Sequence, residues 1–509
     1  MSQAAAGEPA AESARLSRDL LRYLPAAAVP ALCALLGAAL FTRLFSPAAY
    51  GLFSLVLSVT GPLSTVLGQP TGQAASRFYS EYRARREEGL YRAAMTVLSG
   101  ATAAGALGVM GLGLATAGWW GHIPGGVPVV LAAGALVLGS ALTTALLPVL
   151  AASFRPAPYT MALSGAAVLS VGVSAALVLL EGPRVVYLVL GPAIAALAVL
   201  PIVVRRVHLV APRQLWRLWH DAAVREALTR FLAYGTPLAT WFVLTSLLSS
   251  GDRYVLAWLS GTRAVGVYSV NYTLSSQAVG LLNLPVVTAA WPVIARQWAG
   301  ARRAAMGKSL TALSTLYLTL ALGVAAAVWT ASRPLATLLL GPAFRAGYVV
   351  CGPVLAGTVL WGLARIGQKS LELHERTGWM VKDAAVAAAA SLLLTALLVP
   401  RWSYMGAAWA TLAGYALYTV LVWRDARRCI PWTLDAPALM ASLGVAAGAA
   451  CAVSRWLPQP HAAVVAAAAD GGATALLYGA GLVARDRMKY GSNRTWKNIL
   501  QGLFLLDEL

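Results

Sequence analysis

The chain is poor in charge for its length, and what charge it has is mostly of one sign. Only 11% of its 509 residues are charged, and 19 acidic residues stand against 39 Lys and Arg. Hydrophobic residues make up 59%, and the mean hydropathy is +0.69. This composition excludes disordered, coiled-coil and secreted disulfide-rich proteins, and it leaves too few polar residues to cover a soluble protein. The net charge of +20 therefore points to a membrane rather than to nucleic acid.

Cysteine is scarce, and catalytic motifs are absent. Cys33 and Cys451 lie inside apolar runs, Cys351 begins another, and Cys429 follows two arginines. No pair is placed for a disulfide, and no Cys/His cluster predicts a metal site. There is no phosphate-binding Gly loop, HExxH motif or Ser nucleophile elbow. The sequence thus predicts no metal, no cofactor and no enzymatic reaction.

Long apolar runs are abundant instead. Fourteen reach the length of about 20 residues that crosses ~30 Å of hydrocarbon. Their centres lie near Leu32, Ser58, Leu107, Leu138, Leu169, Ile194, Thr240, Leu274, Leu320, Gly357, Ser391, Gly414, Val445 and Ala473. With the N-terminus inside, 31 of the 39 basic residues fall on inner segments, as the positive-inside rule requires. The prediction is an all-α, polytopic membrane protein with both termini in the cytoplasm.

Three connecting stretches carry further expectations. Residues 213–230 and 494–506 place Trp and aliphatic side chains at helical spacing, which predicts helices lying flat on the inner leaflet. A solvated loop and a frayed tail are the alternatives. The longest outer connection, residues 332–347, is too short for a catalytic domain.

An internal repeat is indicated at an offset of 215 residues. LFSPAAYGLFS at 44–54 aligns with LSGTRAVGVYS at 259–269, and Gly51 pairs with Gly266. Six helices separate the copies, so an axis along the membrane normal relates the two halves. The predicted segments are a cytoplasmic tail (1–17), an N-terminal six-helix lobe (18–204), an amphipathic linker (205–230), a C-terminal six-helix lobe (231–430), helices 13 and 14 (431–484) and an amphipathic tail (485–509).

Polar side chains follow the second helix of each half. Gln69 and Gln73 lie one turn apart on the first, and Tyr268, Asn271 and Tyr272 recur on the second. Unsatisfied amides are costly in hydrocarbon, so these faces are predicted to line a hydrated cavity. Helix packing is the alternative for the neighbouring Ser and Thr residues.

Charged residues at or inside the spans are the other candidates, and each has a structural alternative. They are Arg43, Arg77, Asp252, Arg253, Arg365, Lys369 and Asp470. A terminal Arg can snorkel to a lipid headgroup, and Asp252 can simply pair with Arg253. Asp470 is a candidate proton or cation site, with a shallow peripheral position as the alternative.

Four stretches carry a resemblance to a known family. They are LLRYLPAAAVPALCALLGAALFTRLFSPAAYGLFSLVLSV near the N-terminus, RFYSEY after the second helix, GDRYVLAWLSGTRAVGVYSVNYTL, and LVPRWSYMGAAWATLAGYALY. In these stretches the chain resembles the polysaccharide (O-antigen type) flippases of the multidrug/oligosaccharidyl-lipid/polysaccharide exporter superfamily. The likeness runs in order from about residue 18 to 485.

The resemblance implies two six-helix lobes around a cationic cavity, with helices 13 and 14 forming a groove for a lipid tail. It implies export of an undecaprenyl-pyrophosphate-linked oligosaccharide across the bacterial inner membrane. Arg43, Arg77, Asp252 and Arg253 occupy matching family positions, Arg365 and Lys369 lie in a corresponding basic stretch, and Asp470 matches no family pattern. The basic residues are then candidates for the pyrophosphate, which the planar Arg fork suits. The sugar candidates are Gln69, Gln73, Tyr268, Asn271 and Tyr272, and the coupling candidates are Asp252 and Asp470.

The expected partners are the lipid-linked oligosaccharide, membrane lipids, H+ or Na+ as the coupling ion, and a polysaccharide polymerase or ligase, with no nucleic acid. Three alternatives stay open. A multidrug/cation antiporter of the same superfamily would be expected to have an acidic cavity. A peptidoglycan-precursor flippase and a membrane enzyme that transfers glycans are the others.

Overall fold

The protein is helical throughout the part that the structure describes. The computed structural model describes residues 7–116, 126–153, 156–210, 215–299, 303–456 and 462–490, and no strand occurs among them. The helices are α1 (Gly7–Leu44), α2 (Pro47–Ala84), α3 (Glu88–Ala115), α4 (Gly126–Ala152), α5 (Pro156–Glu181), α6 (Val185–Val207), α7 (Leu215–His220), α8 (Ala222–Ser250), α9 (Asp252–Ala299), α10 (Arg303–Thr330), α11 (Ser332–Leu339), the 3-10 helix η2 (Pro342–Val350), α12 (Cys351–Leu373), α13 (Thr377–Cys429), α14 (Ala436–Trp456) and α15 (Ala463–Tyr490).

The predicted all-α polytopic fold is confirmed. Among the described residues, 12 helical segments are long and apolar enough to span a membrane. Two of them, Ala222–Leu282 and Thr377–Cys429, would reach about 80–90 Å as straight helices, far beyond the ~30 Å of hydrocarbon. Non-helical backbone interrupts them at Gly261 (φ 77°) and Ser403 (φ 46°). Each therefore holds two crossings, and all fourteen predicted centres lie inside described helices.

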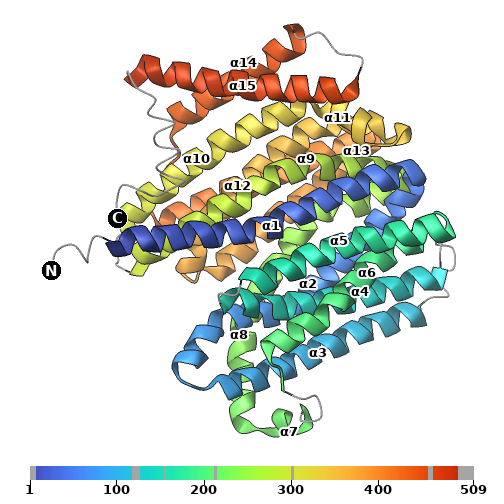
Figure 1. Ribbon diagram of the computed structural model, residues 1–509, viewed down its shortest axis with the longest axis vertical. Coiled ribbons are helices and arrows are strands. Elements are labelled where there is room, and N and C mark those ends of the chain that lie inside the picture. The colour runs from blue at the N-terminus through green and yellow to red at the C-terminus, as the bar shows by residue number, and fades with distance from the viewer. Residues whose placement is uncertain are drawn as a thin grey trace. The chain divides into compact units, whose positions relative to one another are not determined.

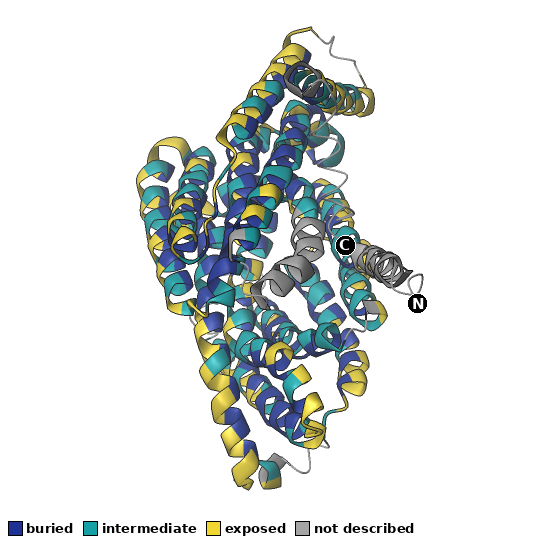
Figure 2. Ribbon diagram, turned by 90° about the vertical axis from the view of Figure 1, so that its left-hand side faces the viewer, coloured by how far each residue is buried: buried dark blue, intermediate teal, exposed yellow. Residues whose placement is uncertain are grey.

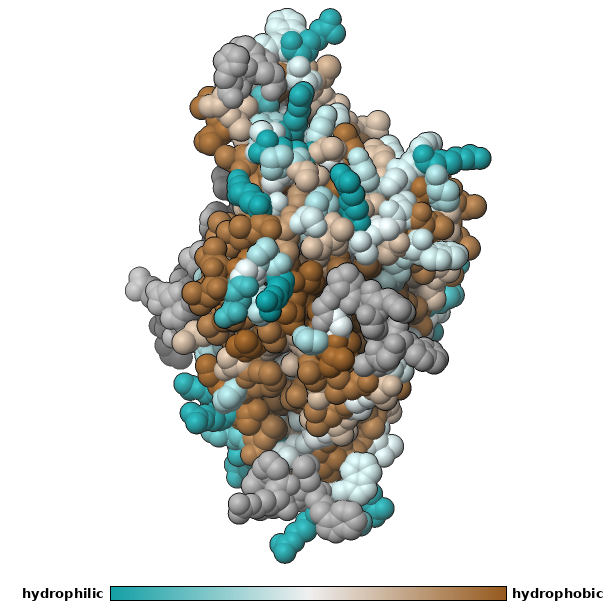
Figure 3. Space-filling model, turned by 90° about the vertical axis from the view of Figure 1, so that its right-hand side faces the viewer, coloured by the Kyte–Doolittle hydropathy of each residue, from teal (hydrophilic) through white to brown (hydrophobic). Residues whose placement is uncertain are grey.

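Large apolar side chains cover the outside of the molecule. Leu180 is 81% exposed, Leu476 76% and Met161 70%. Figure 2 shows exposed and buried faces alternating around individual helices, and Figure 3 shows hydrophobic side chains spread over one face. Such a surface requires lipid around it, and the chain is a multi-pass membrane protein. Strongly exposed tryptophans next to helix ends or breaks suit the interface with water: Trp258, Trp329, Trp402 and Trp456.

The helices divide into two compact units, which are described separately. One contains residues 22–266. In it, α2 packs against α4 and α8. A methyl group added at Gly68 would lie 2.4 Å from the Ala141 carbonyl oxygen of α4, and one at Gly72 would lie 2.5 Å from that of Thr144. These glycines let the α2 and α4 backbones approach closely, as small residues do in membrane helices.

The other unit contains residues 267–509 together with 1–21. The core around α10, α12 and α13 includes Trp432, which is fully buried and donates its indole N–H to the Ser314 hydroxyl at 3.0 Å. The pair α14 and α15 lies beside α10 (Figure 1). Tyr478 of α15 donates to the Thr319 carbonyl of α10 at 2.7 Å, so specific polar contacts hold the pair in place.

The connections differ from the predictions in detail. The predicted outer connection 332–347 is ordered as α11 and most of η2. The predicted flat helix 213–230 is interrupted: α7 ends at His220, and Asp221 caps α8 by accepting a hydrogen bond from the Ala223 amide. A capping carboxylate fixes a helix start that apolar periodicity alone does not reveal. The predicted tail helix 494–506 lies outside the described residues.

Candidate functional site

A polar stripe runs along α2 in the first unit. Thr65, Gln69, Gln73 and Arg77 follow one another at four-residue intervals, so they lie on one side of the helix. Gln73 donates its amide N–H to the Gln69 side-chain oxygen at 2.8 Å. Both amides are half-buried and Arg77 is exposed. The stripe therefore keeps polar atoms available for a ligand.

The opposite side of α2 explains why the stripe is left unburied. Thr71, Ala74, Ala75 and Phe78 are buried in the core of this unit. A helix turns about 100° per residue, which places these side chains away from the stripe. Close packing thus uses the small and apolar residues of α2, and its long polar side chains remain on the free side.

The RFYSEY segment ends the stripe in a cationic corner. The guanidinium of Arg77 lies 5.7 Å from the ring centroid of Phe78, and that of Arg230 in α8 lies 4.9 Å from it. Glu81 forms ion pairs with Arg230 at 2.8 Å and with Arg85 at 2.9 Å. Arg77 forms no ion pair with any described residue. The exposed guanidinium of Arg77 thus has no carboxylate partner among the described residues, whereas that of Arg230 is paired with Glu81.

Arg230 was missed by sequence reasoning. It was counted only among the basic residues that orient the chain, because nothing in the sequence places it beside Phe78. The stacking of Phe231 on Phe78, with ring centroids 4.8 Å apart, brings it there. The one feature of the sequence that could have indicated Arg230 is its place next to Phe231 at the start of an apolar run.

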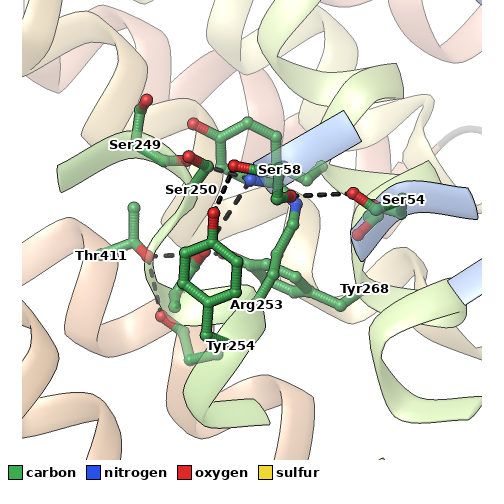
Figure 4. Close-up of polar contacts among 12 residues, drawn as sticks. Ser54, Ser58, Ser249, Ser250, Arg253, Tyr254, Tyr268 and Thr411 are labelled. Atoms are coloured by element: carbon green, nitrogen blue, oxygen red, sulfur yellow. Dashed lines mark hydrogen bonds and ion pairs between the residues drawn. The ribbon is translucent and has the colours of Figure 1, made fainter. Parts of the chain in front are cut away.

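The GDRY segment forms a buried corner in the same unit. Asp252 and Arg253 are 2% and 8% exposed, and their charged atoms lie 3.8 Å apart. Arg253 also donates to the Ser249 carbonyl oxygen at 3.1 Å, while the Tyr254 hydroxyl donates to the Ser58 carbonyl oxygen of α2 (Figure 4). The geometry ties the start of α9 to α2, so this Arg is far less open to an anion than Arg77.

Arg43 ends α1 and is exposed. Its guanidinium donates to the Ala39 carbonyl oxygen at 2.7 Å, one turn back in the same helix. Such a contact suits a cation at a helix C-terminus. The side chain remains on the surface, where a headgroup or an anionic cargo can reach it.

In the second unit, two of the predicted sugar contacts are fully enclosed. Tyr268 and Asn271 are 0% exposed. Asn271 donates to the carbonyl oxygens of Val267 at 2.9 Å and of Phe344 in η2 at 3.0 Å. The hydroxyl groups of Tyr268 and Thr411 are 3.4 Å apart. Both side chains hold α9 against neighbouring elements in this conformation.

Tyr272 belongs to an aromatic group in which it and Trp361 are half-buried and Tyr415 is buried. Its hydroxyl lies 2.9 Å from that of Tyr415, and the Tyr415 ring lies 5.1 Å from Trp361 of α12. Arg365 and Lys369 follow Trp361 at four-residue steps on the same side of α12. Lys369 pairs with Glu372 at 2.6 Å, whereas Arg365 is exposed and forms no ion pair with a described residue. The second unit thus carries an aromatic surface with an uncompensated guanidinium beside it.

Asp470 lies in α15 and is 2% exposed. Its backbone carbonyl accepts hydrogen bonds from the hydroxyl groups of Thr330 and Thr474, at 3.3 and 2.7 Å. One carboxylate oxygen is buried without a hydrogen-bond partner. The structure thus places Asp470 where α15 contacts the end of α10.

Each unit by itself carries groups that suit an anion attached to a polar, ring-containing group. Arg77 and Arg365 offer the charge, and the paired Gln side chains and the aromatic surface offer contacts for hydroxyl groups and rings. Within the described part of the chain, no group of three or more His, Cys, Asp or Glu side chains is placed to hold a metal ion.

Comparisons with known proteins bear on the family and the fold of the chain. Residues 23–298, more than half of the chain, match the model of a family described as Polysaccharide biosynthesis protein. No curated protein matches the sequence. The structure is similar to that of the lipid II flippase MurJ in an inward closed conformation, with a TM-score of 0.60 at 11% identity, covering 91% of this chain and 99% of that chain. It is similar to that of the MATE transporter VcmN of Vibrio cholerae, with a TM-score of 0.60 at 17% identity and coverages of 82% and 97%. It also matches an inward-facing multidrug resistance MATE family transporter of the MOP superfamily, with a TM-score of 0.56 at 13% identity and coverages of 80% and 97%. The TM-scores show that the chain shares its fold with these proteins.

Proposed function

Because the chain belongs to the polysaccharide biosynthesis protein family, we propose that it is a flippase for a lipid-linked oligosaccharide. The cargo is an oligosaccharide on undecaprenyl pyrophosphate, which passes from the cytoplasmic to the periplasmic leaflet of a bacterial inner membrane for surface polysaccharide synthesis. Only the head group has to cross, since the polyprenyl tail can remain in lipid.

The observation that carries the proposal is the pair of exposed guanidinium groups without ion pairs, Arg77 and Arg365. Each lies at the end of a stripe of sugar-compatible side chains, the amides of Gln69 and Gln73 on α2 and the Trp361 ring on α12. An Arg fork binds a pyrophosphate through two charge-assisted hydrogen bonds. An amphiphile with an anionic centre and a glycan therefore fits either stripe, each considered within its own unit.

The membrane potential favours export of such a cargo. With the cell interior negative, moving an anion outward gains about 2.3 kcal/mol per charge per 100 mV. Inward movement of H+ or Na+ is the proposed additional driving force, for which Asp252 is the first candidate group and Asp470 the alternative. The cytoplasmic termini, the lobe boundaries predicted above and the lipid-tail groove of the last two spans belong to the same proposal.

The alternatives differ in the cargo that they require. A multidrug antiporter for cationic compounds needs acidic groups facing its cargo, but the two stripes carry arginines. A peptidoglycan-precursor flippase would carry the same pyrophosphate, and the fold of MurJ favours it as the second candidate. A membrane glycan-transferring enzyme is disfavoured because the similar structures are those of a flippase and a transporter.

The test combines gene deletion with charge removal. In a strain that lacks the gene, a lipid-linked oligosaccharide should accumulate on the cytoplasmic leaflet. Analysis of its glycan would identify the cargo. Complementation with Arg77→Gln/Arg365→Gln should restore surface polymer at least tenfold less well than the native chain, because each charge-assisted contact is worth about 1.5–3 kcal/mol. Arg83→Gln is the matched control, an exposed Arg on α2 without an ion pair to a described residue.

Two outcomes would contradict the proposal at different levels. Full export by the double variant, at equal membrane abundance, would remove these two residues from the site. A deletion strain that accumulates lipid II instead of a lipid-linked oligosaccharide would favour the second candidate cargo.

A further inference from the structure

Two glycines of the first unit touch each other through bare backbone. A methyl group added at Gly51 would lie 1.9 Å from the Thr262 carbonyl oxygen and 2.9 Å from the Gly266 nitrogen. A methyl group added at Gly266 would lie 1.9 Å from the Pro47 carbonyl oxygen and 3.0 Å from the Gly51 nitrogen. Both glycines are buried. No other residue type fits at either position without moving the backbone.

The contact is reciprocal because of the internal repeat. Gly51 corresponds to Gly266 and Pro47 to Thr262 at the same offset of 215 residues. Each glycine meets the residue that begins the other copy of the helix, at matching distances. This is the pattern of an isologous contact, in which residue i meets j and j meets i. The local axis that relates the two copies therefore passes between Gly51 and Gly266.

The start of α2 and the interruption of α9 lie at equivalent positions of the repeat. Ser46 caps α2 and accepts a hydrogen bond from the Ala49 amide at 3.3 Å. Its counterpart at the offset of 215 residues is Gly261, whose φ of 77° interrupts α9. Each glycine of the contact thus lies on the first turns after a break. By the predicted topology, both breaks face the outer side of the membrane.

The surroundings limit how the contact can change. The rigid neighbours of both glycines are backbone atoms, which cannot rotate away as a side chain would. Gly61 of α2 and Gly280 of α9 are unlike them, since a methyl group at either position would meet nothing within 4 Å. A crossing without side chains forms close Cα–H···O contacts. It can also separate without leaving any side chain unpacked.

We propose that Gly51 and Gly266 form the outer seal of the transport cycle, closed in this structure and open when cargo leaves outward. Side-chain-free backbone lets the two repeats close tightly and part cleanly. An alanine at either position holds the crossing apart, from 1.9 Å toward the 3.4 Å of ordinary contact. It therefore shifts the protein toward the outward-open state. The inference rests on the transport cycle proposed above, but not on its cargo.

Cysteine labelling tests the seal without any cargo. Ser58 lies on the same side of α2 as Gly51, two turns farther along, and is 6% exposed. In a chain whose four native cysteines are replaced by alanine, Ser58→Cys reports access to this position by a membrane-impermeant maleimide. Gly51→Ala and Gly266→Ala should each raise the outside labelling rate at least tenfold. Gly61→Ala and Gly280→Ala are the matched controls, because they share the gain in helix propensity but add no clash.

The double variant Gly51→Ala/Gly266→Ala tests whether the two glycines form one contact. Once one methyl group has separated the crossing, the second finds space, so Gly51→Ala/Gly266→Ala should label little faster than either single variant. A multiplicative effect of the two changes would overturn the common seal. Labelling equal to that of the controls, or raised only from the cytoplasmic side, would overturn the proposal as well.

A cross-link provides the opposite perturbation and does not depend on whether the alanine variants fold. Pro47→Cys/Thr262→Cys joined by a short bis-methanethiosulfonate, which forms one disulfide with each Cys and releases a sulfinate at each end, should hold the seal closed and suppress export, and reduction of the disulfides should restore export. A protease site introduced into residues 211–214 reveals the cross-link on a gel. Persistent export by the cross-linked chain would refute the seal. A seal that behaves as expected in a chain that exports no oligosaccharide would leave the seal standing and refute the cargo instead.

Discussion

Glu81 offers a sharp test of the cationic corner because its removal should improve binding. It holds Arg230 at 2.8 Å and Arg85 at 2.9 Å. The guanidinium groups of Arg230 and of the uncompensated Arg77 lie 4.9 and 5.7 Å from the ring centroid of Phe78. An anionic head group that approaches Arg77 must compete with Glu81 for Arg230. Glu81→Gln keeps the shape of the side chain and removes the competing charge.

The magnitude follows from the exposure of the partners. The side chains of Arg230 and Arg85 are 45% and 55% exposed, so each ion pair is worth about 0.2–1 kcal/mol. Freeing Arg230 should therefore tighten binding of a polyprenyl pyrophosphate about 1.5- to 5-fold. The gain should shrink as salt is raised, since the contacts are exposed to solvent.

The assay is a titration of polyprenyl pyrophosphate into the purified chain in nanodiscs at two salt concentrations. Glu88→Gln is the matched control, because Glu88 forms a similar exposed ion pair with Arg92 at 3.0 Å. In an Arg230→Gln background the effect of Glu81→Gln should disappear. Weaker binding by Glu81→Gln, or an equal gain in the Arg230→Gln background, would refute the reasoning.

Two further predictions concern the second unit. Gly367→Ala should lower the free energy of unfolding by about 1–3 kcal/mol, because the new methyl group would lie 2.3 Å from the buried ring of Trp432. Gly378→Ala is the control, because a methyl group there would meet nothing within 4 Å. Equal thermal midpoints for the two variants would contradict the prediction. Asp470→Asn should raise the thermal midpoint and leave export within about twofold of native, since a buried carboxylate without an ion pair to a described residue is costly and the amide is less so. Loss of export at normal abundance would instead make Asp470 a coupling residue.

The sequence was sufficient for the membrane spans and for the pairing of Gly51 with Gly266 in a repeat. Crossing hydrocarbon requires long apolar helices whatever their neighbours are, so hydropathy alone placed all fourteen centres inside helices. The match of Gly51 with Gly266 was visible as one identity in a weak repeat. The contact between the two glycines could not be predicted, because only the structure shows that they touch each other. The short helices α11 and η2 were also missed, since segments of 8 and 9 residues carry too little periodicity to stand out from a loop.

The candidate site was only partly predictable. Spacing puts Gln69 and Gln73 on one side of a helix, and Tyr268, Asn271 and Tyr272 on one side of another, but it cannot tell a cavity from a packing surface. In the structure, the amides of α2 stay half-exposed, whereas Tyr268 and Asn271 are enclosed against α13 and η2. Trp361 and Tyr415 gave no signal, because an aromatic residue in an apolar span is ordinary. Their importance comes from pairing across α12 and α13, which no local pattern records.

The helix α2 carries most of the proposed machinery, and its composition explains how one helix can do so. Gly51 touches the second repeat near one end, Gly68 and Gly72 lie against α4 in the middle, and Arg77 projects near the other end. Gly51 and Arg77 are separated by about 39 Å of helix, more than the hydrocarbon thickness. Two prolines, Pro62 and Pro70, interrupt the hydrogen-bond ladder between them. A proline-weakened helix can bend between its ends while each end keeps its own contacts. Opening at Gly51 can therefore occur while the close packing of Gly68 and Gly72 on α4 stays intact, and the polar stripe remains fixed to that part of the helix.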